Sequence, residues 1–173
     1  MNQFILILNG PICSGKTKVA DSIMSNYKKV FSLSANKIKF LISDYTPNRD
    51  RTVVHECLML IAEKMLQNGM SLLLEGGSVT QGKLNENLSE LARKYGLGVV
   101  TVNIEAPINV LKKRFEERLA IAAERGSKLS VTNDVGYMER YNAYQSVKKE
   151  GHKVFDSSIQ SPEKIAKEIM ALV

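Results

Sequence analysis

The chain has 173 residues, of which 44% are hydrophobic, 24% are charged and only four are proline, a composition that excludes a disordered protein and fits one compact domain with a real core. No segment is apolar over the length of a membrane span, and the apolar run near the N-terminus is too short for a signal peptide. The net charge of +6 indicates an anionic partner. Because the basic residues are dispersed along the chain, we favour a small phosphate-bearing ligand over nucleic acid.

The first predicted strand and the loop after it carry the most informative motif. Residues 4–8 are an apolar run of the length of a buried strand. Residues 10–17 then read G-P-I-C-S-G-K-T, which matches the phosphate-binding pattern G-x-x-x-x-G-K-[ST]. From Gly15 onward, apolar residues recur at helical spacing. The motif therefore lies between a strand and a helix, as the phosphate-binding interpretation requires.

Each part of this motif has a chemical reason. Glycines let backbone N–H groups approach an anion, and the following helix points its positive end at the same place. Lys16 adds a positive charge near the outer phosphates, and the Thr17 hydroxyl can bind Mg²⁺. We therefore predict that ATP and Mg²⁺ bind to Gly10, Pro11, Ile12, Cys13, Ser14, Gly15, Lys16, Thr17 and Lys18.

Predicted strands and helices alternate along the rest of the chain. Further strands are predicted at residues 29–33, 70–74, 97–104 and 153–155. Helices are predicted at residues 35–43, 52–67, 82–95, 107–124, 133–149 and from Ser161 onward. Polar loops are predicted at residues 44–50 and 125–132. This order predicts an α/β protein with three α/β/α layers and a five-stranded parallel sheet, whose ligands bind beyond the carboxyl ends of the strands.

Glu75 ends the apolar third strand. An acid at this place resembles a Walker B position, which holds a Mg²⁺-bound water or acts as a base. The glycine pair that follows would let a ligand approach the backbone closely. We therefore predict that Glu75 is a catalytic and metal-binding residue and that Gly76, Gly77 and Ser78 contact the acceptor. The alternative is an ordinary acid at a strand end.

The helix predicted at residues 107–124 carries two arginines four positions apart, and a third follows in the next loop. Arg114 and Arg118 share one helix face, and Arg125 lies beyond the helix. Arginines placed before a polar loop predict a lid, here over residues 114–132, that clamps the phosphates during transfer. The alternative is a solvated helix face with ion pairs along it.

The chain resembles small P-loop kinases, and most nearly the zeta-toxin, polynucleotide-kinase and chloramphenicol-phosphotransferase group. The resemblance rests on residues 5–17, on the helix with Arg114 and Arg118, and on the ending at residues 154–163, and it covers nearly the whole chain. It implies one kinase-like domain over residues 1–173, lid arginines that contact phosphates, and a last segment that frames the adenine. The activity it implies is phosphoryl transfer from ATP. The two cysteines, Cys13 and Cys57, form no disulfide framework, which predicts a location in the reducing cytoplasm.

The chain departs from these kinases after the second strand. They usually have a catalytic Asp there, whereas this chain has Asn36, whose amide cannot accept a proton as a general base. Asp44 or Glu75 would then take that role, or transfer would be slow. Around this position we predict that the acceptor contacts Asn36, Lys39, Arg49 and Arg51.

Two alternative functions stay open from the sequence. Residues 10–17 together with residues 73–78 also resemble the isopentenyltransferases, which implies prenyl transfer from dimethylallyl diphosphate to adenine. That family also has an Asp after the second strand, where this chain has Ser34. The other alternative is a nucleotide-binding regulator with little catalysis. The kinase-like C-terminal strand and helix favour the first interpretation, while the acceptor and the oligomeric state are not predicted.

Overall fold

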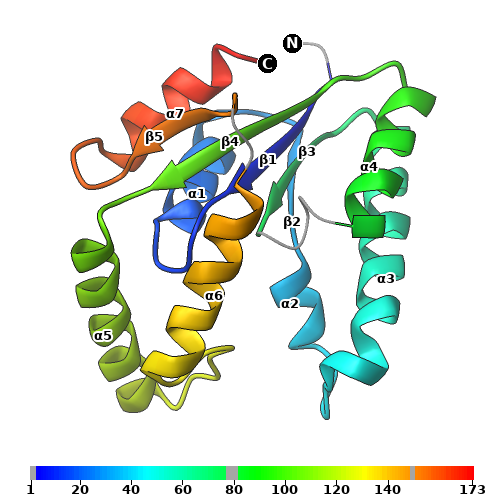
Figure 1. The fold of residues 1–173 in the computed structure, drawn as a ribbon. Helices are drawn as coiled ribbons and strands as arrows, with labels where there is room; N and C mark the ends of the chain where they lie inside the picture. The colour runs from blue at the N-terminus through cyan, green and yellow to red at the C-terminus, as the bar shows by residue number, and fades with distance from the viewer. Residues whose placement is uncertain (1–2, 77–81, 149–150) are drawn as a thin grey trace.

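The structure is a computed structural model that describes residues 3–76, 82–148 and 151–173 (Figure 1). Its five strands form one parallel sheet in the order β2-β3-β1-β4-β5. The strands are β1 (Ile5–Asn9), β2 (Val30–Ser34), β3 (Ser71–Glu75), β4 (Val99–Glu105) and β5 (Lys153–Asp156). The predicted five-stranded parallel sheet is confirmed, and each predicted strand lies within two residues of its observed position.

The described helices connect the strands, with two in succession after β2 and after β4, and one follows β5. They are α1 (Lys16–Asn26), α2 (Ala35–Lys39), α3 (Pro47–Gln67), α4 (Gly82–Lys94), α5 (Ile108–Arg125), α6 (Asp134–Val147) and α7 (Pro162–Met170). Within the described residues, none of these helices combines the length and the apolar character needed to cross a membrane.

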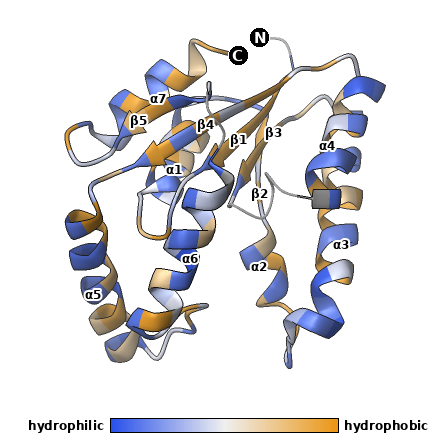
Figure 2. Ribbon diagram, in the orientation of Figure 1, coloured by the Kyte–Doolittle hydropathy of each residue, from blue (hydrophilic) through white to orange (hydrophobic). Residues whose placement is uncertain are grey.

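Strand β1 lies at the centre of the sheet, and its side chains alternate between two helical layers. Leu6 and Leu8 pack against α1 and α7, whereas Ile5 and Ile7 pack against α3 and α4. All four side chains are fully buried, and the central strands are correspondingly the most apolar ribbons in Figure 2. The predicted three-layer α/β/α architecture is therefore confirmed, and it holds the loop after β1 at the middle of the carboxyl edge.

Helix α3 begins earlier than predicted. We expected a polar loop over residues 44–50, but the helix starts at Pro47. Thr46 is the N-cap, and the fixed φ of proline suits the first helical position. The Asp50 carboxylate, four residues beyond Thr46, accepts a hydrogen bond of 2.7 Å from the Thr46 backbone N–H. Residues 47–50 of the expected loop are thus the first turn of a helix whose start is held by this bond.

Helices α5 and α6 cover neither face of the sheet. They project from its carboxyl edge as an arm, residues 108–147, which we call the α5–α6 arm (Figure 1). The rings of Phe115 and Tyr137 stack with centroids 4.8 Å apart and join the two helices. The same apolar cluster includes Ile12 and Cys13 of the loop after β1. The arm is therefore packed directly on that loop.

Candidate active site

The loop between β1 and α1 owes its path to two glycines. Gly10 has a φ of +146°, and a Cβ at this residue would lie 2.1 Å from the backbone oxygen of Ile104. Gly15 has a φ of +90° and is the residue immediately before α1. Backbone conformations of this kind favour glycine strongly. The loop thus passes β4 at a distance that no side chain allows.

Lys16 lies inside this loop. Its Nζ donates hydrogen bonds to the backbone oxygens of Gly10 at 2.9 Å and Pro11 at 2.6 Å, and it lies 3.2 Å from Ser14 Oγ. Removal from water lowers the pKa of Lys16 to about 8, although the nearby Glu75 acts in the opposite direction. An anion beside this ammonium would compensate for the lost hydration.

Thr17 and Glu75 meet beside the loop. Thr17 Oγ1 donates to Glu75 Oε2 at 2.8 Å, and the Ser32 hydroxyl lies 3.4 Å from Glu75 Oε1. Glu75 is only 7% exposed, and the sheet fixes its position opposite Leu8 of β1. Thr17 and Glu75, the two residues predicted to bind Mg²⁺, are therefore in direct contact with each other.

The donor set of Thr17 and Glu75 suits Mg²⁺. Mg²⁺ binds oxygen ligands and is usually held by one or two protein groups together with waters and substrate phosphates. Within the described residues, no group of three or more His, Cys, Asp or Glu side chains is placed to hold a metal. One hydroxyl and one carboxylate beside a phosphate-binding loop are as many protein ligands as Mg²⁺ usually takes, because waters and substrate phosphates supply the others.

Arg114 ties the α5–α6 arm to the segment after β5. Its Nη1 donates to Ser157 Oγ at 2.9 Å, and its Nη2 donates to the Ser157 backbone oxygen at 2.8 Å. Ser157 in turn lies against the loop, because a Cβ on Gly15 would be 3.7 Å from the Ser157 Cβ. Arg114 is thereby fixed beside the start of α1.

Arg118 acts on the loop at Cys13. Burial raises the pKa of the Cys13 thiol, and interactions with Arg118, Lys16 and Arg114 partly oppose that rise. The charges of these three basic side chains therefore act on the same residue of the loop.

Two residues predicted to contact the nucleotide lie elsewhere. Arg125 is exposed at the last residue of α5, roughly 10 Å beyond Arg118 at the rise of an α-helix. Lys18 is exposed on α1 and lines a groove of about 370 Å³ that also contains Pro162 of α7. Neither side chain has a hydrogen bond or ion pair to the loop in the described part of the chain.

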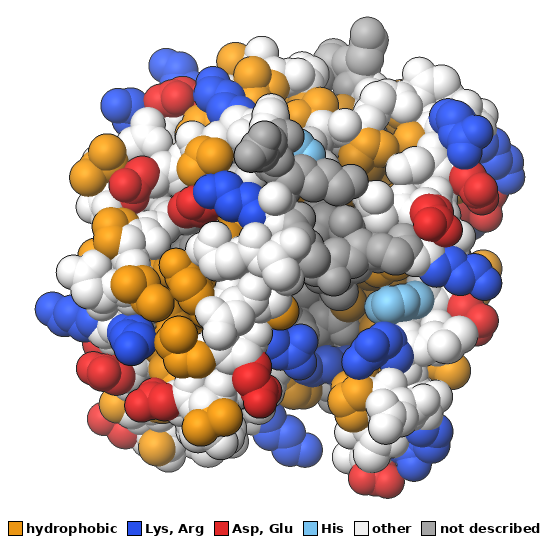
Figure 3. All heavy atoms as spheres, in the orientation of Figure 1, with side chains coloured by type: hydrophobic (Ala, Val, Ile, Leu, Met, Phe, Trp, Pro, Cys, Tyr) orange, Lys and Arg blue, Asp and Glu red, His pale blue; other side chains and the backbone are white. Residues whose placement is uncertain are grey.

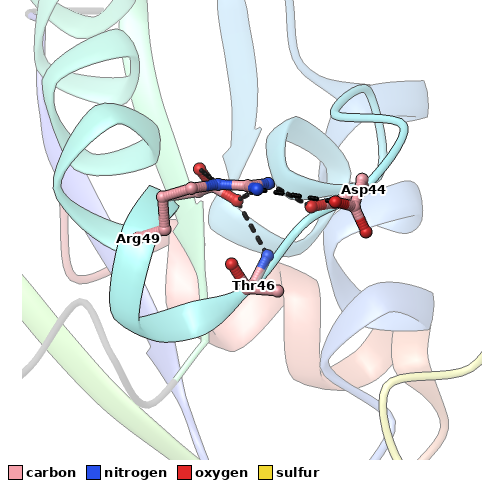
Figure 4. Close-up of polar contacts among 4 residues, drawn as sticks. Asp44, Thr46 and Arg49 are labelled. Carbon is pink, nitrogen blue, oxygen red and sulfur yellow. Dashed lines mark hydrogen bonds and ion pairs between the residues drawn. The ribbon is translucent and has the colours of Figure 1, made fainter.

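Asp44 and Arg49 belong to the connection before α3. Figure 4 shows Arg49 directed toward Asp44, with Thr46 close by. Arg49 Nε is 2.7 Å from Asp50 Oδ1, its Nη1 is 3.4 Å from Asp44 Oδ2, and its Nη2 also binds the Asp44 backbone oxygen. The Asp44 side chain is 86% exposed. An arginine shared by two carboxylates is a poor receptor for an acceptor anion, and an exposed, paired Asp44 is a weaker candidate base than Glu75.

The remaining predicted acceptor contacts are distributed around the carboxyl edge. Asn36 is exposed in the first turn of α2, and Arg51 is exposed on α3, where its charge adds to desolvation in lowering the pKa of His55. Gly76 has a φ of +121° and its N–H donates to Leu8 O at 3.3 Å. Gly77 and Ser78 lie outside the described residues.

Lys39 contacts a segment that is far from it in sequence. Its Nζ donates to Ser130 Oγ, in the loop between α5 and α6, at 2.8 Å. The sequence suggested no role for Ser130, because a serine in a loop carries no local signal of a site, whereas Ser157 lies in the segment at residues 154–163 that the family resemblance had singled out.

Comparison with known proteins supports the fold. A family model described as an AAA domain matches residues 5–134. A solved structure from Chloroflexus aurantiacus, of a protein provisionally named a kinase, has a TM-score of 0.73 and 16% identity, with 100% of both chains covered. The tunicamycin resistance protein of Deinococcus radiodurans has a TM-score of 0.62 and 17% identity over 99% of this chain and 95% of that chain.

A third similar structure holds ligands. The APS kinase of Mycobacterium tuberculosis, solved with AMPPNP and APS, has a TM-score of 0.61 and 13% identity over 99% of this chain and 98% of that chain. A search of curated protein sequences finds no match. At these identities the similarity to solved structures concerns the fold, and together with the family model it confirms the predicted resemblance to small P-loop kinase-like NTPases.

Proposed function

The chain belongs to the AAA domain family, and from this premise we propose that it is an ATP-dependent phosphotransferase acting on a small-molecule acceptor. One observation carries the proposal: the Thr17 hydroxyl is hydrogen-bonded to Glu75 at 2.8 Å beside the loop that holds the Lys16 ammonium. Lysine, hydroxyl and carboxylate are the three side-chain types with which P-loop proteins handle a nucleotide triphosphate and its metal.

In this proposal ATP lies on residues 10–17. Lys16 exchanges its bonds to the loop carbonyls for bonds to the outer phosphate oxygens, which satisfies its charge in a partly desolvated place. Thr17 and Glu75 would hold Mg²⁺, which supplies neutralisation of the charge on the transferring phosphoryl group. The predicted cytoplasmic location belongs to the same proposal.

The α5–α6 arm is proposed to act as the lid of one kinase-like domain over residues 1–173, with residues 114–132 as its active part. Arg114 and Arg118 are near enough to the loop to stabilise negative charge that develops during transfer. Arg125 would serve only if the lid moved its far end inward. The similar APS kinase structure, which contains AMPPNP, supports ATP as the donor.

Phosphoryl transfer depends mainly on positioning and charge stabilisation, so Asn36 in place of an acid is compatible with the reaction. We propose Glu75, rather than Asp44, as the acid closest to the chemistry. The acceptor would lie over the end of β3, near Gly76, Gly77 and Ser78, and within reach of Asn36, Lys39 and Arg51.

The proposal is tested by calorimetric titration of the purified chain with ATP–Mg²⁺, ADP and dimethylallyl diphosphate, followed by an acceptor screen that measures ADP release. Tight ATP–Mg²⁺ binding together with acceptor-dependent ADP release is the expected result. Nucleotide binding without turnover above background would instead indicate a regulator. Tighter binding of dimethylallyl diphosphate would overturn the kinase proposal in favour of prenyl transfer.

A further inference from the structure

Two buried asparagines face each other at the point where β1 ends. Asn9 is the last residue of β1 and lies opposite Asn103 of β4 in the parallel ladder. Asn9 Nδ2 donates a hydrogen bond to Asn103 Oδ1 at 3.0 Å. The two residues are 1% and 0% exposed, whereas the charged side chains in Figure 3 lie on the surface, where water solvates them. The pair is therefore a polar contact inside the core.

This pair leaves two buried polar atoms without a partner. Asn9 Oδ1 and Asn103 Nδ2 are closed off from solvent and form no hydrogen bond within residues 3–76, 82–148 and 151–173. A buried amide atom without a partner loses its hydration and gains no bond in return, so it destabilises the folded state. Two apolar side chains in the same place would avoid that loss. The asparagines are thus poorly suited to stabilising the core, and a different role has to account for them.

The pair distinguishes one register of the β1–β4 ladder from another. The preceding positions on the same face are Ile5 opposite Val99 and Ile7 opposite Thr101. Largely apolar pairs of this kind specify register weakly, because a shift of two residues keeps every side chain on its own face. The hydrogen bond between the two amides requires the observed register. Buried polar residues are known to fix register in this way, although they lower stability.

The two asparagines stand next to the close crossing of the loop over β4. Gly10 follows Asn9 and Ile104 follows Asn103. A Cβ on Gly10 would lie 2.1 Å from the backbone oxygen of Ile104. The backbone oxygen of Gly10 in turn accepts a hydrogen bond of 2.9 Å from Lys16 Nζ. The register of the asparagine pair therefore determines where Gly10 crosses β4, and with it where Lys16 is held.

We propose that Asn9 and Asn103 are positioning residues for nucleotide binding, because their hydrogen bond fixes the register in which the loop after β1 holds Lys16. The inference rests on the proposed function for the identity of the ligand, ATP–Mg²⁺. Both asparagines are enclosed in the core, so they act through the backbone of the loop and do not touch the nucleotide. The pair thus contributes to ligand affinity, while it lowers the free energy of unfolding.

The test replaces both amides at once. Asn9→Val/Asn103→Val introduces β-branched side chains, which suit a strand, and removes the two unpartnered atoms. Asn9→Ala/Asn103→Ala removes them without added bulk, in case two valines overpack the site. The more stable of the two double variants is compared with the wild type. Ile7→Val is the control, because Ile7 is fully buried on the same face of β1 two residues earlier.

Three quantities are measured for each protein: the urea midpoint of unfolding, the affinity for ATP–Mg²⁺ by calorimetry, and amide hydrogen exchange of residues 10–17 by mass spectrometry. The double variant should unfold at a urea midpoint equal to or above that of the wild type, because it buries no unpartnered amide. Its affinity should fall by about tenfold or more, the equivalent of one misplaced charge-assisted contact, and its loop should exchange faster. Ile7→Val should lower the midpoint and leave affinity and loop exchange unchanged.

Two results would overturn the inference. A double variant with wild-type affinity and wild-type loop exchange would show that the loop keeps its place without the asparagines. Urea midpoints below that of the wild type in both double variants would show that the asparagines serve the stability of the core instead.

Failure of this inference can be told apart from failure of the proposed function. Exchange of the loop amides is measured without nucleotide, so it reports on the loop even if the wild type binds no ATP–Mg²⁺. In that case faster loop exchange in a stable double variant supports the role of the pair, while the proposed function fails. Equal ATP–Mg²⁺ binding by the wild type and the double variant contradicts the inference and leaves the proposed function intact.

Discussion

The surroundings of Lys16 in the loop after β1 and those of Lys39 at the end of α2 are built in opposite ways. Around the loop, the ammonium of Lys16 is held by backbone oxygens, Glu75 is buried, and a glycine passes within contact distance of β4. Around Lys39, the contact is made between a half-buried lysine and the exposed Ser130 from two separate segments. The first arrangement depends on the backbone of the fold. The second depends on side chains alone and can change residue by residue.

The largest expected effect comes from removing the charge at the centre of the loop. Lys16→Ala should lower phosphotransferase turnover by about 10²–10³-fold, as loss of a group that stabilises developing charge does. The fold should persist, because the ammonium is already disfavoured by desolvation. Turnover is measured by ADP release and folding by circular dichroism, with the exposed Lys28→Ala as the control. Wild-type turnover in Lys16→Ala would break the assignment of the loop to catalysis.

The next effect concerns how firmly the loop is fixed by the fold. Gly10→Ala should lower the free energy of unfolding by about 3 kcal/mol or more, because its Cβ would lie 2.1 Å from a backbone oxygen of β4. Gly69→Ala is the matched control, since it also has a positive φ but no atom within 4 Å of a Cβ, and it should cost about 1 kcal/mol. Urea denaturation measures both. Equal costs would mean that the loop can move away from β4.

The pairing of Thr17 with Glu75 is tested through the metal. Thr17→Val and Glu75→Gln should each weaken the enhancement of ATP binding by Mg²⁺ by about tenfold or more, because each removes an oxygen ligand or its charge. Thr17→Ser keeps the hydroxyl and should retain the enhancement. Nucleotide affinity is measured with and without Mg²⁺. Full enhancement in Glu75→Gln would leave Glu75 with a structural role only.

A smaller effect follows from the pKa of Lys16, which desolvation lowers to about 8. A phosphate beside the ammonium would raise this pKa, so the complex holds more protons than the free protein above pH 8. Nucleotide affinity should therefore be constant below the pKa and fall with rising pH above it, by up to about tenfold per pH unit. Calorimetry in buffers of different ionisation enthalpy would report the proton uptake. Affinity that does not vary up to pH 10 would contradict the placement of phosphate next to Lys16.

The smallest effect is expected at Asp44. Because its side chain is 86% exposed and bound to Arg49, Asp44→Ala should leave turnover unchanged. A large loss of turnover in Asp44→Ala with an unchanged free energy of unfolding would instead show that Asp44 acts as the general base.

The sequence predicts those features of the fold and the site that local backbone geometry fixes, and it misses those that depend on tertiary contacts. The motif at residues 10–17 could be recognised because backbone geometry fixes its internal spacing, and Glu75 could be recognised because it ends an apolar strand. The start of α3 was missed because Thr46 and Asp50 are polar both in a loop and in a cap, and only the hydrogen bond between them distinguishes the two. Lys39 and Ser130 are far apart in sequence, so no local pattern predicts that tertiary packing brings them together. Arg125 was predicted to contact phosphate because it follows Arg114 and Arg118, but it lies at the far end of α5, away from the loop after β1.

The place of β1 in the sheet also has a consequence for synthesis of the chain. Its neighbours are β3 at residues 71–75 and β4 at residues 99–105, and the arginine at its loop is held by residue 157. A chain that emerges from the ribosome N-terminus first presents the nucleotide motif early, yet its supports are translated much later, and such non-local pairings form slowly. The phosphate-binding motif is thus synthesised first, but its partners in the fold are synthesised late. Until then the apolar side chains of β1 are exposed to solvent and to aggregation.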